Sequence, residues 1–331
     1  MQKTPMTLTS RTQDGGGALH LLAMTKGVTS HVPLPAEIRS IVRADDEYLL
    51  RRLDCINLEL LRGDFMRATL WNTTWVMNVT HLTYPDGPMR YAALYDFPPD
   101  SQRRPVSVRA LSDRLNVPYE TVRRNLVALE EQGLCERVRG EGVFIPTSVH
   151  QRPQNVEGVR MLGGLIHKFL AELKRLGFDF TQFREPAHPL QNDPALVLRA
   201  ALRVDTDYSL EMADLLRALH KATPVELAIY GAICTPNTRG IAASSADVPD
   251  EQRRPISGLA LSHTLRVPYE TLRRVSNVMV REGKLERVKD GLIVPLRVQL
   301  SYETDDVLRA RYERLVRYVR DLRHIGITMP M

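Results

Sequence analysis

Long apolar runs, paired cysteines and signal-peptide features are missing from this sequence of 331 residues. No stretch of 18 apolar residues occurs, so we expect no transmembrane helix, and the start, MQKTPMTLTSRTQDGGG, is polar where a signal peptide would be apolar. The three cysteines, Cys55, Cys135 and Cys234, show neither metal-ligand spacing nor an even count. These absences predict a cytoplasmic protein with reduced thiols.

Recognisable settings for catalysis are also missing. The nine histidines show no metal-ligand pairing, and no serine, cysteine or carboxylate lies in a known nucleophile motif. Gly15 to Gly17 could suggest a phosphate loop, but no Gly-Lys-Ser/Thr follows them. The sequence therefore predicts a protein that is not an enzyme and that uses no cofactor or metal.

The dominant feature that is present is an internal repeat. The segment 117–124 reads VPYETVRR, and 150 positions later the segment 267–274 reads VPYETLRR. Residues 100–138 and 250–288 match without a gap at 21 of 39 positions. Because this spacing is too long for a solenoid repeat, the sequence predicts two tandem copies of a complete domain, arranged as a pseudo-twofold pair.

The repeat suggests a division of the chain. We expect a flexible N-terminal arm at 1–39, a first repeat at 40–182, a linker at 183–197 and a second repeat at 198–331. Long amphipathic helices are predicted at 159–176 and 306–325, and their apolar stripes need a partner surface, which could be a homodimer interface. Further upstream, apolar spacing predicts a helix at 48–62, preceded by the acidic residues Asp45 to Glu47, and a second one at 65–79.

Each repeat contains a helix, a short turn, a second helix and a hairpin. Ser107 and Ser257 are suited to cap the first helix, and Pro118 and Pro268 suit the start of the second. Gly133 and Gly283 lie where a C-terminal glycine cap belongs. Two short apolar runs follow each glycine, at 134–138 and 143–146 and at 285–288 and 292–295, which predicts a β-hairpin.

This order, together with Thr121-Val122-Arg123 and Thr271-Leu272-Arg273, resembles the DNA-binding core of bacterial winged helix-turn-helix regulators of the GntR and MarR type. The resemblance covers about 80 residues of each half. It implies a mainly α fold with small β-wings (α+β) and double-stranded DNA as the partner. Net positive charge, +6, permits such a polyanionic partner.

The candidate contacts form three sets, because an α-helix fits the major groove while flanking basic residues reach phosphates. The second helix of each copy offers Tyr119, Glu120, Thr121, Arg123 and Arg124, and Tyr269, Glu270, Thr271, Arg273 and Arg274. The corner before the first helix offers Arg103, Arg104, Arg253 and Arg254. The wing offers Arg137, Arg139, Arg287 and Lys289. Glu120 and Glu270 could equally stabilise the helix dipole, and basic hairpin tips are also common on solvated surfaces.

The resemblance implies a sequence-specific, nucleoid-associated regulator of transcription that places two recognition helices of one chain on an imperfect inverted repeat. Two alternatives stay open. One is a plasmid or phage replication initiator with two winged-helix domains, and the other is a scaffold whose winged helices bind proteins. The sequence does not identify an effector molecule or the direction of regulation.

Overall fold

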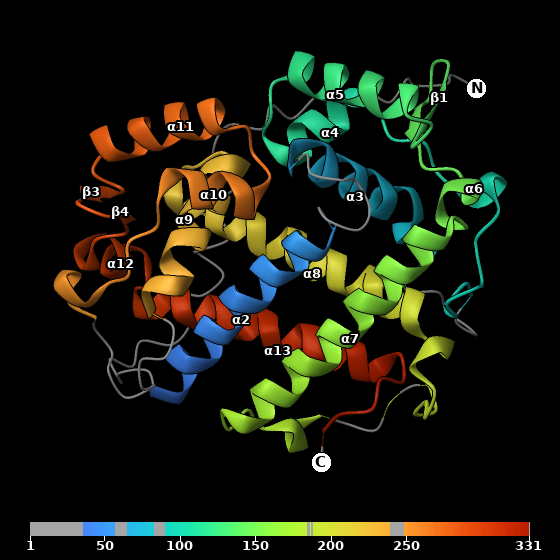
Figure 1. Ribbon diagram of the computed structural model, residues 1–331. Coiled ribbons are helices and arrows are strands. Elements are labelled where there is room, and N and C mark those ends of the chain that lie inside the picture. Colours follow the sequence, from blue (N-terminus) through green and yellow to red (C-terminus); the bar gives the residue numbers. More distant parts are fainter. Residues whose placement is uncertain are drawn as a thin grey trace, which may run out of the picture. The chain divides into compact units, whose positions relative to one another are not determined.

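The computed structural model describes residues 36–56, 65–82, 90–183, 186, 188–238 and 248–330 (Figure 1). The helices of the first half are α2 (Ala36–Cys55), α3 (Phe65–Val79), α4 (Val108–Leu115), α5 (Tyr119–Glu131), α6 (Thr147–His150) and α7 (Pro153–Arg175). Those of the second half are α8 (Leu198–His220), α9 (Pro224–Thr238), α10 (Gly258–Leu265), α11 (Tyr269–Arg281), α12 (Leu296–Tyr302) and α13 (Asp305–His324). Short 3-10 turns are η2 (Thr80–Leu82), η3 (Asp100–Gln102), η4 (Phe180–Gln182), η5 (Pro194–Leu196) and η6 (Asp250–Gln252).

Each half carries one antiparallel hairpin. In the first half β1 (Glu136–Val138) pairs with β2 (Gly142–Phe144), and in the second β3 (Glu286–Val288) pairs with β4 (Gly291–Ile293). A mainly helical structure with two small hairpins agrees with the predicted α+β class. The described elements of the two halves also follow one another in the same order, from α2 to α7 and from α8 to α13.

A central bundle is formed by α2, α7, α8 and α13, which contact one another (Figure 1). Its apolar core includes Phe169, Leu170 and Leu173 of α7 and Val319 and Leu322 of α13. The apolar stripes of the two long helices therefore find their partner surface within this chain. Residues 34–331 form one compact unit, and this core draws on both predicted repeats.

Reciprocal tyrosine–aspartate pairs join α2 to α8 inside the bundle. The Tyr48 hydroxyl donates a hydrogen bond to Asp205, and the Tyr208 hydroxyl donates one to Asp45 over 2.6 Å. All four side chains are buried. Since Tyr48 and Asp45 occupy the positions in the first half that Tyr208 and Asp205 occupy in the second, each half supplies the partner that the other needs.

Buried arginines balance the charge of these aspartates. Arg52 forms an ion pair with Asp205, and Arg311 pairs with Asp45 at 3.4 Å and also with Asp46. Burial raises the pKa of Asp45 to about 6, although Arg311 opposes this shift. A buried carboxylate without such a partner would be far more costly, so the ion pairs are a condition for packing α2 against α8 and α13.

The prediction of a helix over 48–62 was wrong at its start, because α2 begins at Ala36. Asp45 and Asp46 lie inside that helix rather than before it. They resemble first-turn acids in the sequence, but their partners, Tyr208 and Arg311, come from more than 160 positions away. The helix predicted at 65–79 is confirmed as α3. Residues 57–62 and most of the predicted N-terminal arm lie outside the described residues.

Two smaller apolar cores support the hairpins. The first contains Leu111, Val122 and Leu126, packed against Leu70 and Trp71 of α3. The second contains Leu261, Leu272 and Met279, packed against Ile229 and Ile233 of α9, together with Phe65 of α3. Because Phe65 belongs to the first half, the second core is completed by a residue from the other repeat.

Candidate nucleic-acid interface

The first helix of each helix-turn-helix is capped as its sequence predicts. The Ser107 hydroxyl accepts a hydrogen bond from the backbone N–H of Ala110 at 3.0 Å, and Ser257 does the same for Ala260 at 3.1 Å. Such a cap is worth about 1 kcal/mol. Both helices end in a left-handed residue, Asn116 or Arg266, which turns the chain toward the next helix.

The second helices, α5 and α11, bury one face and expose the other. Val122, Leu126 and Leu129 of α5 are buried in the first small core. The exposed residues at the start of the two helices are Tyr119, Glu120, Arg123 and Arg124, and Tyr269, Glu270, Arg273 and Arg274. Thr121 and Thr271 are half-buried. The geometry thus leaves the polar face of each first turn open to a partner, as a recognition helix requires.

Within this face, one arginine of each pair is held by a glutamate. The Arg123 guanidinium donates to Glu120 at 2.6 Å, and Arg273 donates to Glu270 at 2.9 Å. The hydrogen bond from Arg123 holds the pKa of Glu120 below its usual value, so this carboxylate is ionised at neutral pH. The ion pair orients Arg123 along the helix surface and also competes with any anionic ligand.

The neighbouring arginines are placed differently. Arg124 and Arg274 are exposed, and within the described ranges their side chains make no hydrogen bond or ion pair. They keep their full charge and rotamer freedom, which suits contact with a phosphate. The two arginines of each pair are therefore not equivalent, a difference that the repeated Arg-Arg sequence alone does not reveal.

In both copies an isolated β-bridge holds the wing close to the segment that precedes the first helix. Val106 and Val143 exchange two backbone hydrogen bonds of 2.9 Å, and Ile256 and Leu292 form the matching bridge. Gly142 has a φ of +140°, and a Cβ there would lie 2.4 Å from the backbone of Val106. Only glycine allows this approach, so the wing's position depends on that residue.

The basic wing residues differ between the copies. Arg137 forms an ion pair with Glu130 at 3.0 Å, whereas Arg287 donates to the neutral amide of Asn277 at 2.9 Å. The tips, Arg139 and Lys289, are exposed, and their contact with phosphates stays a prediction. Because Asn277 carries no charge, the wing arginine of the second copy retains more of its positive field.

Net charge shows the same asymmetry. Residues 100–150 contain eight basic and seven acidic side chains, a net charge of +1, whereas residues 250–300 contain ten basic and six acidic ones, a net charge of +4. Nonspecific attraction to DNA depends on such positive charge. Residues 250–300 therefore carry the greater net positive charge of the two segments.

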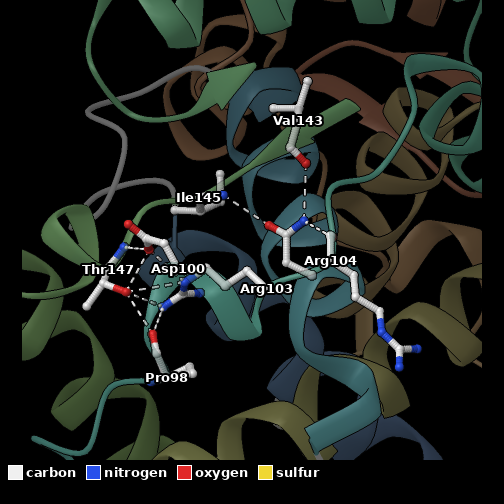
Figure 2. A network of polar contacts seen from close by, with 8 residues as sticks. Pro98, Asp100, Arg103, Arg104, Val143, Ile145 and Thr147 are labelled. Carbon is white, nitrogen blue, oxygen red and sulfur yellow. Dashed lines mark hydrogen bonds and ion pairs between the residues drawn. The ribbon is translucent and has the colours of Figure 1, made fainter. Parts of the chain in front are cut away.

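The prediction for Arg103 and Arg253 needs correction, because both side chains are buried, with exposures of 6% and 4%. Arg103 donates to the backbone carbonyl of Pro98 at 3.1 Å and forms an ion pair with Asp100 at 3.3 Å (Figure 2). Burial lowers its pKa to about 10. Arg253 donates to the side chain of Gln299 at 2.8 Å. Both arginines hold the corner together and face no ligand.

Arg104 and Arg254, in contrast, are exposed. In Figure 2 the Arg104 side chain extends away from the polar network around Arg103. Only the second arginine of each Gln-Arg-Arg-Pro motif is thus available to a phosphate. The shared motif combines one residue that stabilises the fold with one that is free to bind.

Sequence reasoning missed a pair of asparagines that fix this corner. The Asn78 side chain donates to the carbonyls of Arg104 and Val143 at 2.8 and 3.2 Å and accepts from the N–H of Ile145 at 3.0 Å. Asn237 donates to the carbonyl of Arg254 at 2.6 Å. The sequence did contain a signal for these asparagines, because each is a polar residue near the end of an apolar helix, α3 or α9. These asparagines connect the corner, the wing and the supporting helix.

We predict a clear separation between the two arginines of the first corner. Arg103→Ala should lower the free energy of unfolding by about 2–4 kcal/mol, because it removes the buried cation that joins the Pro98 carbonyl, Asp100 and Thr147 and leaves its space empty. Arg104→Ala should leave unfolding within about 0.5 kcal/mol of wild type and weaken DNA binding instead. Urea denaturation and duplex titration of both variants measure the two effects. Equal unfolding midpoints for the two variants would contradict the assignment.

Comparison with known protein families supports the nucleic-acid assignment. Residues 101–148 match the family model of the DeoR-like helix-turn-helix domain. The match spans η3 to α6 and so contains α4, α5 and the first wing. No curated protein matches the chain, and no solved structure matches it.

The DeoR-like domain supports a regulator of transcription that binds double-stranded DNA, which is the class that the sequence resemblance implied. It points to DNA binding rather than catalysis. The GntR or MarR type stays a prediction, as does the second copy's membership of the same class. Across the described ranges, no helix is long and apolar enough to span a bilayer. No group of three or more metal-ligating side chains occurs in that same part of the chain.

Proposed function

We propose that this protein is a sequence-specific transcription regulator that binds an imperfect inverted repeat with α5 and α11 of a single chain. One observation carries the proposal. Both helices expose the same Tyr-Glu and Arg-Arg residues in their first turns, and α5 lies within the matched DeoR-like domain. A typical regulator supplies its two recognition helices from two identical chains. Here tandem duplication would supply both.

The reciprocal pairing in the central bundle supports this view. The Tyr48–Asp205 and Tyr208–Asp45 hydrogen bonds relate the two halves in the manner of a dimer interface, where residue i contacts j and j contacts i. Covalent duplication of a self-complementary surface produces that pattern. The second small core, which includes Phe65 of the first half, adds a further connection between the copies.

Unequal copies imply unequal half-sites. The first turns are identical at Tyr, Glu, Thr and both arginines, whereas Asn125 to Val127 correspond to Val275 to Asn277. The half-sites should therefore share the bases read by the first turn and differ beside them. With its higher net charge, the second copy contributes the larger share of the salt-dependent affinity.

Footprinting with the full chain tests the proposal. We expect protection of two similar segments whose centres lie about 34–36 Å apart, one helical turn of DNA, or a multiple of that distance. Each phosphate contact should add about 0.9 to the slope of log affinity against log salt. Protection of one segment only would contradict the two-helix arrangement. Iterated sites at a replication origin would favour an initiator, and no duplex affinity at low salt would favour a protein-binding scaffold.

A further inference from the structure

A cavity of about 200 Å³ lies between α2, α3, α8 and α9, apart from the DNA-binding surface described above. Its walls are mainly apolar and include Leu53, Ile56, Phe65, Leu210 and Leu227. Apolar cavities of about 150 Å³ with Leu, Ile and Phe walls can bind benzene. The space here is thus large enough for one single-ring aromatic molecule with a small substituent.

Most polar groups that line the cavity have partners within the protein, although Nε and Nη1 of Arg217 have no hydrogen-bond partner in the described part of the chain. The charged members are paired: Asp46 with Arg311, Arg52 with Asp205, and Asp214 with Arg114 and Arg217. The hydroxyls of Thr69, Thr73 and Ser209 donate to backbone carbonyls. No lining charge is left without a counter-charge among these residues, so a charged ligand would gain no partner for its desolvation.

Asn72 contributes an amide group to the lining. Its side chain lines the cavity and is only 8% exposed, and it makes no hydrogen bond with any residue in the described structure. Its amide nitrogen and oxygen are not sealed from accessible space, so a molecule in the cavity can reach them. An amide can both donate and accept, so it complements a hydroxyl group. Asn72 therefore marks the place where a ligand's polar group would bind.

We propose that this cavity binds one uncharged, single-ring aromatic molecule that carries a hydroxyl group, with Asn72 as its hydrogen-bonding partner. The apolar walls supply most of the affinity, and Asn72 selects the hydroxyl. Phenol and toluene are a suitable pair of probes, because they have nearly the same shape and differ in this one group.

The cavity also contacts the helix-turn-helix. Leu115, the last residue of α4, forms part of its wall. The adjacent Arg114 pairs with Asp214 of α8, and the Arg217 guanidinium donates to the carbonyl of Arg114 at 2.9 Å. A ligand in the cavity therefore lies against the junction of α4 and α8. An effect of the ligand on DNA affinity rests on the proposed function, whereas binding of the ligand does not.

Calorimetric titration of the full chain without DNA tests the site. We expect one phenol per chain, with toluene binding roughly 3- to 10-fold more weakly, the ratio that one hydrogen bond provides. Asn72→Leu should bind toluene but lose the preference for phenol. Ala213→Phe places a ring inside the cavity and should weaken both ligands at least roughly tenfold. Ala171→Phe, the same change at an exposed position of α7, should bind as wild type does.

Three results would overturn the proposal. These are no binding of either probe to the wild-type chain at millimolar concentration, unchanged binding by Ala213→Phe, and an unchanged phenol preference in Asn72→Leu. If Asn72→Leu does not fold, Ala213→Phe and Ala171→Phe still decide whether the cavity is the site. Because DNA is absent, failure of the proposed regulatory function would leave these results unaffected.

Discussion

Alanine at both Arg123 and Arg273 is expected to weaken binding to the specific duplex by a factor of at least about 30, with the fold intact. Each good arginine–guanine contact provides about 1–3 kcal/mol of discrimination, so the loss of two gives about 2–6 kcal/mol. Both side chains are exposed, and each makes only an ion pair with the glutamate three residues before it. Exposed pairs of this kind contribute little to stability. Fluorescence titration with a footprinted site and with an unrelated duplex measures the change.

A matched control exists on α7. Arg175 and Glu172 form the same kind of exposed pair, three residues apart and with a distance of 2.6 Å. Arg175→Ala removes one positive charge and one ion pair outside the proposed interface, as Arg123→Ala or Arg273→Ala alone does inside it, so it should bind the specific duplex nearly as wild type does. Wild-type affinity in the Arg123 and Arg273 double variant would remove both arginines from the site. A loss of affinity in the control equal to that of either single variant would show that the effect comes from net charge alone.

Asp205→Ala should lower the free energy of unfolding by about 3–5 kcal/mol, the cost of leaving a buried charge without its partner. Asp205 is fully buried and accepts hydrogen bonds from Tyr48, Arg52 and Tyr318. Its removal leaves the Arg52 guanidinium, which is 5% exposed, without a counter-charge. Urea denaturation at neutral pH measures the loss.

The corresponding control is Asp113→Ala on α4. Asp113 pairs with Arg109 at 3.0 Å, and both side chains are more than half exposed. We expect a change of less than about 1 kcal/mol for this variant. A similarly small change for Asp205→Ala would show that the ion pair between the halves does not hold α2 against α8, and the dimer-like interpretation of the bundle would lose its energetic support.

Local signals in the sequence were sufficient for much of the interface. Ser107, Pro118 and Gly133 act on backbone groups a few residues away, so caps and helix ends follow from short segments. Amphipathic spacing likewise identified the buried face of α5. The match to the DeoR-like family confirms the helix-turn-helix class for residues 101–148.

Signals from neighbouring residues could not predict which side chains are buried or which distant residues they contact. Arg103 and Arg104 are adjacent and chemically identical, and the sequence treats them alike. One is enclosed by the Pro98 and Thr147 segments, and the other faces solvent. The start of α2 was missed for the same reason, since the carboxylate of Asp45 finds its partners only after α8 and α13 pack against it.

The amino-acid sequence alone predicted two related helix-turn-helix segments with arginines at matching places, because caps, turns and amphipathic faces depend on neighbouring residues. Tertiary structure alone decided which arginines are available, how the two halves exchange tyrosine–aspartate pairs, and where an apolar cavity remains between them. Those properties depend on contacts between segments that are 44 to 46 positions apart at the buried arginines and 157 to 163 apart at the tyrosine–aspartate pairs. The free energy of such contacts is set by packing and desolvation rather than by local pattern.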